Sequence, residues 1–114
     1  MANHAENYFK IYLTETVTEN QVTELIEFLD PFNLLRVYDL DIDIIDIQNR
    51  IISGSIISAW CEPMDTFRML VTRFSFIESI RNQCNEEGCD YYSILKFDRI
   101  PNISTDECFQ VASL

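Results

Sequence analysis

The run LLRVYDLDIDIIDIQNRIISGSIISAW fills residues 34–60 and decides the expected fold. Over residues 34–47, apolar side chains alternate with aspartates, and this period of two predicts a long β-strand. The alternation changes phase at Ile44 and Ile45, where two apolar residues follow each other. A strand absorbs such a change only through a bulge or bend, so we expect one at this point.

The second part of the run predicts a turn and a returning strand. Gln48, Asn49 and Arg50 are suited to the turn, and residues 51–60 are rich in isoleucine, a good strand former. Gly54 lies inside this strand, where a glycine usually marks a bulge or a close approach of another chain segment.

Upstream of this run, the sequence predicts a strand and a helix. Residues 8–15 alternate between polar and apolar side chains, and the residues before them are expected to form a loose tail. Thr18-Glu19-Asn20-Gln21 fits a capping box, in which Thr18 and Gln21 each accept a hydrogen bond from the other's backbone N–H. The helix is expected to end at Asp30-Pro31, because a residue before proline is displaced from the helical region.

Downstream, the sequence predicts a second helix and a hairpin. Pro63 suits the first turn of this helix, whose buried face is expected to consist of Phe67, Leu70, Val71 and Phe74. Residues 85–88, Asn-Glu-Glu-Gly, are typical of a hairpin turn, so residues 76–82 and 90–97 are expected to be its strands. The alternative is that the helix continues into residues 76–82. Residues 100–114 form a tail for which the sequence predicts no definite structure, although Pro101 and Asn102 suggest a loop.

These elements give the order strand–helix–strand–strand–helix, followed by the hairpin. Such an order favours an α+β protein with a mostly antiparallel sheet and both helices on one face. We therefore expect a ferredoxin-like sandwich that forms a single domain over residues 1–114. Apolar residues make up 47% of the chain, which is enough to build a core and too many for a disordered acidic tail.

The chain is strongly acidic, with 19 Asp and Glu against eight Lys and Arg and a net charge of -11. Direct binding to nucleic acid needs cations, and an anionic membrane would repel this chain, so we expect neither partner. A basic protein surface would be attracted, although acidity can also serve solubility alone. The sequence shows no secretory signal or membrane-spanning run, so we expect a cytoplasmic protein with reduced cysteines.

The acids concentrate between Glu15 and Asp46, where nine of them face one cation, Arg36, so this stretch carries -8 of the -11. Glu27 and Asp30 fall in the last turn of the helix, where the helix dipole disfavours anions. Aspartates on one strand face lie ~6.8 Å apart, which is of the same order as the ~3.4 Å phosphate spacing along one DNA strand. We therefore expect an interaction surface made of Asp39, Asp41, Asp43, Asp46, Glu24, Glu27 and Asp30. A solvated strand face is the alternative.

Metal binding, cysteine chemistry and catalysis have weaker support in the sequence. Asp39, Asp41 and Asp43 could hold Mg²⁺ or Ca²⁺, but such a site needs ligands from several elements, and no EF-hand spacing is present. Cys84 and Cys89 flank the hairpin turn and could form a disulfide or half of a zinc site, although two reduced thiols are the simpler interpretation. The sequence shows no phosphate-binding glycine loop, internal histidine or nucleophile elbow, so we expect neither an enzyme nor a cofactor.

One resemblance is carried by residues 54–98. Ser58-Ala59-Trp60-Cys61-Glu62-Pro63 precedes a helix that ends at Phe74, and Glu86-Glu87-Gly88 then lies between two strands. This order resembles the ferredoxin-like domain of YubB-type phage and plasmid proteins. Cys61 and Glu62 depart from that pattern, where smaller polar residues and proline are usual. The resemblance implies the fold and an origin in a mobile genetic element.

A second resemblance is one of class. Small, acidic, glycine-poor proteins of this length resemble the phage anti-CRISPR inhibitors that act as DNA mimics against type I surveillance complexes. The resemblance implies binding to a lysine-rich DNA-binding groove of a Cas complex inside the host cell. The alternatives are an immunity protein that neutralises a basic nuclease toxin, a metal-dependent enzyme that uses Asp39, Asp41 and Asp43, and a structural or oligomeric module in which the acidic residues form no site.

Overall fold

A computed structural model of the chain describes residues 4–59, 61, 63–86, 92–100 and 109–113. Its elements follow in the order β1 (His4–Leu13), α1 (Glu19–Phe28), the short 3₁₀ helix η1 (Pro31–Asn33), β2 (Val37–Asp46), β3 (Ile51–Ala59), α2 (Met64–Arg73), β4 (Ile77–Glu86), β5 (Tyr92–Arg99) and β6 (Phe109–Ser113). The predicted α+β class is confirmed. No helix in the described part of the chain has the length and apolarity needed to span a bilayer.

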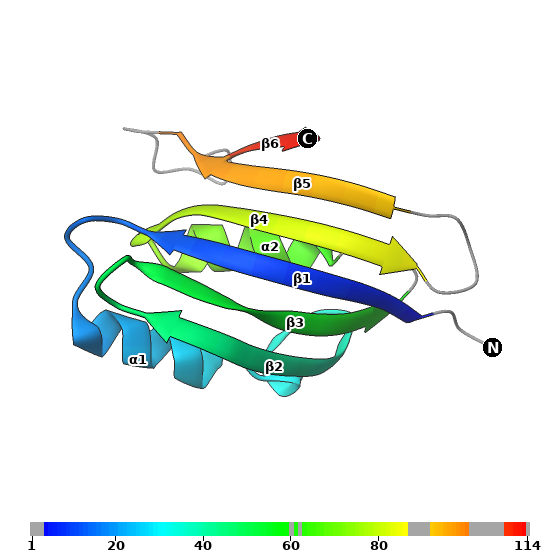
Figure 1. The fold of residues 1–114 in the computed structure, drawn as a ribbon, viewed down its shortest axis with the longest axis horizontal. Coiled ribbons are helices and arrows are strands. Elements are labelled where there is room, and N and C mark those ends of the chain that lie inside the picture. Colours follow the sequence, from blue (N-terminus) through cyan, green and yellow to red (C-terminus); the bar gives the residue numbers. More distant parts are fainter. Residues whose placement is uncertain (1–3, 60, 62, 87–91, 101–108, 114) are drawn as a thin grey trace.

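The strands form one sheet in the order β2-β3-β1-β4-β5-β6, and every neighbouring pair is antiparallel. Figure 1 shows α2 behind β4 and α1 alongside β2. Buried residues of both helices join one apolar core with the strands, so both helices cover the same face of the sheet. We call the opposite face, which no described element covers, the open face.

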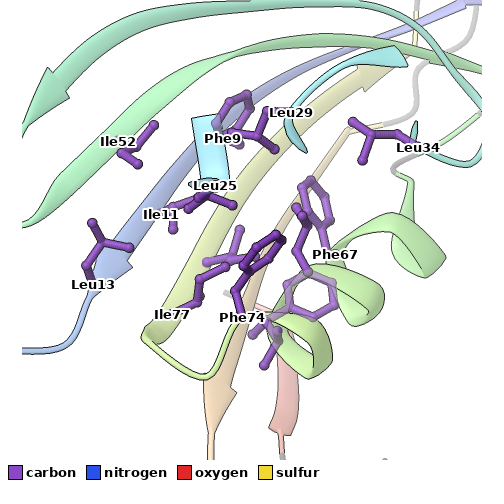
Figure 2. Close-up of a cluster of buried hydrophobic side chains, with 14 of the residues drawn as sticks. Phe9, Ile11, Leu13, Leu25, Leu29, Leu34, Ile52, Phe67, Phe74 and Ile77 are labelled. Atoms are coloured by element: carbon purple, nitrogen blue, oxygen red, sulfur yellow. The ribbon is translucent and has the colours of Figure 1, made fainter. Parts of the chain in front are cut away.

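The two faces follow from the alternation along β1, the strand at the centre of the sheet. Phe9, Ile11 and Leu13 are buried against the helices, whereas Tyr8 and Lys10 are exposed on the open face. In Figure 2 the buried side chains of β1 lie among those of both helices, including Leu25 of α1 and Phe67 of α2. The predicted core face of α2, Phe67, Leu70, Val71 and Phe74, is confirmed.

Local signals set α1 as expected. The backbone N–H of Gln21 donates to the Thr18 hydroxyl at 3.2 Å, and the Thr18 N–H donates to Gln21 Oε1 at 2.9 Å, so the capping box is complete. The helix ends before Asp30-Pro31, and Pro31 then begins η1. The predicted turn at residues 48–50 is also present, with Arg50 in the left-handed region at a φ of 60°.

The expectation for the chain start was wrong, whereas the bulge expected in β2 is present. The strand β1 begins at His4, in place of a loose tail up to residue 7, because Ala5 and Asn7 are buried and paired with both β3 and β4. The bulge expected near Ile44-Ile45 lies between Ile42 and Ile44, and a second register shift, between Val37 and Asp39, was not expected. Ile44 therefore falls on the open face.

The C-terminal part is also more strand-rich than expected. Residues 77–86 form β4, so the strand interpretation was right and the continued helix was wrong. Residues 109–113 form a sixth strand on β5, in a tail for which the sequence predicted no definite structure. Glu87 and Gly88 of the expected turn lie outside the described residues.

Candidate protein-binding surface

The nine acids of residues 15–46 lie on α1, η1, β2 and their connections, a stretch that we call the acidic segment. In Figure 1 these elements occupy the lower side of the molecule, along the β2 edge of the sheet. Eight of the nine acids are exposed and Asp46 is half-buried. Among the described residues, none of them forms an ion pair, so their charges are free to act on a partner.

The strand β2 presents its aspartates at the edge of the sheet. It pairs only with β3, so its outer backbone groups have no strand beside them in the described structure. Asp39 is opposite Ile57 and Asp41 is opposite Ser55, and both aspartates project from the open face. Charged side chains on an edge strand also protect it from pairing with a strand of another molecule, which is a structural reason for their presence.

Asp43 does not continue this row. It is the extra residue at the bulge between Ile42 and Ile44 and has no partner on β3. Its side chain contributes to a hollow on the open face together with Lys10 and Arg81. The regular spacing expected for Asp39, Asp41 and Asp43 therefore holds for the first pair alone.

The helix acids lie on the other layer of the molecule. Glu24 and Glu27 are exposed on α1, which covers the core face. Asp30 lies outside α1, contrary to the expectation that it belongs to the last turn, because the helix ends at Phe28 and Asp30 is the N-cap of η1. The structure thus brings the seven predicted residues to one side of the molecule but divides them between the open face and the helix layer. A partner that contacts all of them has to wrap around the β2 edge.

Three of these acids also have local structural roles. An Asp30 oxygen accepts from the backbone N–H of Phe32 at 2.9 Å and caps η1, and an Asp39 oxygen accepts from the Leu40 N–H at 2.9 Å. Asp46 accepts from the side chain of Asn49 at 2.7 Å and from its backbone N–H at 3.0 Å. These two bonds, the side-chain bond first, lower the pKa of Asp46. Asp46 is therefore at least partly a turn residue.

The alternation pattern did not predict that large apolar side chains beside these acids are exposed. Phe32 is fully exposed, and Leu35, Tyr38, Ile44, Ile45 and Ile47 are between 41% and 55% exposed. Among the large apolar residues exposed in the described structure, these six belong to residues 32–47, and the other two are Tyr8 and Tyr92. Exposed apolar groups among charges are the usual composition of a protein interface, in which apolar contacts form the centre and charges the rim.

The described part of the chain bears on the metal alternative but not on a pairing of Cys84 with Cys89. There, no three His, Cys, Asp or Glu side chains lie close enough together to hold a metal ion. Cys84 is buried, and Cys61 is half-buried with a free thiol. Cys89, the partner of Cys84 in the disulfide alternative, lies outside the described residues. No protein family, curated protein or solved structure matches the chain.

Proposed function

We propose that this protein is a stoichiometric inhibitor that binds the basic, nucleic-acid-binding surface of another protein through its acidic segment. The observation that supports this most is the coincidence on residues 32–47 of exposed apolar side chains with carboxylates that have no ion-pair partner among the described residues. A need for solubility explains the charges but gives no reason for exposing six large apolar side chains between them.

The two kinds of group have different tasks in this proposal. The carboxylates of Asp39 and Asp41 attract Lys and Arg of the partner, which raises the association rate and selects basic surfaces. The exposed apolar groups, such as Leu35 and Ile44, supply the area that is removed from water. Carboxylates spaced along a strand can replace phosphates in a groove that is built to bind DNA.

The target that we propose is a type I CRISPR surveillance complex, which makes the chain a phage anti-CRISPR protein acting in the host cytoplasm. Support comes from its small size, its charge of -11 and its scarcity of glycine. The fold that we propose is a ferredoxin-like core with a two-strand extension. The order β2-β3-β1-β4 with α1 after β1 and α2 after β3 is that of two interleaved split βαβ units, to which β5 and β6 are added.

The test is a competition assay on a purified type I complex. The unmodified protein is expected to reduce DNA binding by the complex in proportion to the amount added. The double variant Asp39→Lys with Asp41→Lys is expected to lose at least about 100-fold in potency, because two close pairs of opposite charge become repulsive. Lysine still protects an exposed edge strand, so this variant separates partner binding from edge protection.

The matched control is Asp65→Lys with Glu78→Lys. These exposed acids lie on α2 and β4, outside the acidic segment, and the change in net charge is the same. The control is expected to retain its potency. Equal potency of the two double variants would contradict the assignment of the surface, and inhibition of a basic nuclease in place of the Cas complex would contradict the assignment of the target.

A further inference from the structure

Three cations lie side by side on the open face of this acidic protein. The strand registers place Lys10 of β1 opposite Arg81 of β4, and Arg81 opposite Lys96 of β5. Partners in register project to the same face, so the three form a row across neighbouring strands with steps of ~4.8 Å. Like charges placed directly opposite each other destabilise a sheet. Three of the eight Lys and Arg residues of this chain therefore lie in an electrostatically unfavourable arrangement.

Neighbouring groups in the described structure neutralise this row only in part. Lys96 Nζ lies 3.5 Å from a carboxylate oxygen of Asp98, and both side chains are partly exposed. The Arg81 guanidinium lies over the ring of Tyr12, 5.8 Å from its centre, which leaves its charge in place. Lys10 and Arg81 form no ion pair with the described residues.

Two hollows adjoin the row. One, of about 360 Å³, is lined by Lys10, Arg81, Tyr8 and Gln83 among others, with Asp43 at its β2 side. The second, of about 390 Å³, is lined by Arg81, Lys96 and Tyr12, with Glu78 and Asp98 contributing acids. Both volumes are in the range of small-ligand sites, and Arg81 and Tyr12 belong to both hollows. Arg81 is therefore shared by the two hollows, with Lys10 lining the first and Lys96 lining the second.

We propose that the row Lys10–Arg81–Lys96 binds the phosphate groups of a nucleoside phosphate. The row is ~9.6 Å long, which is enough for more than one phosphate, and the arginine fork suits phosphate oxygens. Tyr8 lies two residues from Lys10 on the same strand face, and the residue is 51% exposed, so it offers a stacking surface for the base. A small ligand is favoured over a nucleic acid strand, because the net charge of -11 repels a long polyanion.

This site lies on β1, β4 and β5 and does not depend on the function proposed for the acidic segment. Its test is a titration of the isotopically labelled protein with ADP at constant ionic strength, in which the amide chemical shifts are measured by NMR. Saturable shifts are expected at Lys10, Arg81 and Lys96. Arg81→Gln is expected to reduce the affinity for ADP at least about 10-fold, since a charge-assisted bidentate contact is lost.

Arg36→Gln is the control, because it removes one positive charge from an exposed residue before β2. It is expected to leave ADP affinity within about twofold. No saturable shift up to about 10 mM ADP, or an equal loss in both variants, would overturn the site. Pyrophosphate that binds as well as ADP would overturn the base contact at Tyr8, and preference for a single-stranded oligonucleotide at the same amides would overturn the small-ligand assignment.

Discussion

Gly54 lies on β3 at a point where β2 and β1 leave no room for a side chain. A Cβ atom placed on it would lie 2.1 Å from the backbone oxygen of Asp41 on β2 and 2.9 Å from the Phe9 ring on β1. Backbone atoms of a paired strand cannot move away without disturbing the ladder. The Phe9 ring occupies the space that a side chain at position 54 would take. Gly54 and the Phe9 ring therefore pack together beside the β2 bulge.

The substitution Gly54→Ala is expected to lower the free energy of unfolding by about 1–3 kcal/mol, the usual cost of overpacking. This loss outweighs the ~0.4–1 kcal/mol that alanine contributes by restricting the unfolded chain. Urea denaturation monitored by circular dichroism measures it. Ser53→Ala is the control, because Ser53 is adjacent, half-buried and directed to the open face. Equal urea midpoints for both variants would contradict the close contact.

Residue-scale prediction from the sequence was best where the cause is local. The alternation of Asp39 and Asp41 with apolar neighbours predicted their common face. For Gly54 the sequence predicted either a bulge or a close contact, and the structure shows the close contact. The position of Asp43 could not be predicted in the same way. A phase change in a period-two pattern shows that one residue leaves the ladder, but the bulge position is also set by the pairing with β3, which the pattern of β2 does not contain.

The helices and strands could likewise be predicted only where their cause is local. The helix α1 was predicted because its capping box and its Asp-Pro end are short-range signals. The strand β6 was missed because residues 109–113 gain their structure from pairing with β5, a contact that no local pattern records. The early start of β1 was missed for a related reason, since Asn7 is polar and buried. Its side chain donates to Ser58 Oγ at 2.8 Å and accepts from Asn82 at 2.9 Å.

Arg99 joins three elements, and a change there tests how they are held. From the end of β5 it donates to Ile77 O at 2.8 Å and to Phe74 O at 3.0 Å, and it also donates to Val71 O. A cation at the last turn of α2 is favoured by the helix dipole. Arg99→Gln is expected to destabilise the protein by about 1.5–3 kcal/mol, the range for hydrogen bonds to charged groups.

Urea denaturation of Arg99→Gln is best compared with that of Lys96→Gln. Lys96 is on the same strand and loses the same charge, but its partly exposed ion pair contributes only about 0–1 kcal/mol. The expected order of stability is wild type, then Lys96→Gln, then Arg99→Gln. The reverse order of the two variants would show that the three carbonyl contacts of Arg99 contribute little.

At the scale of the whole molecule, charge divides the structure into two parts. The acidic segment forms the β2 side with an excess of -8, whereas the strands β1, β4 and β5 carry a row of cations across the open face. The sequence predicted the first feature because the acids are contiguous along the chain. It could not predict the second, since Lys10, Arg81 and Lys96 meet only through the strand order of the folded sheet.

The salt dependence of binding to a purified type I surveillance complex tests the proposed function most directly. If carboxylates of the acidic segment pair with Lys and Arg of the partner, the affinity of the wild-type protein falls steeply as salt is raised from about 50 to about 500 mM, because screening weakens each pair. Asp39→Lys with Asp41→Lys then binds weakly at every salt concentration. Tight binding that is independent of salt and unchanged in this variant, or no binding by the wild-type protein, would contradict the proposed function.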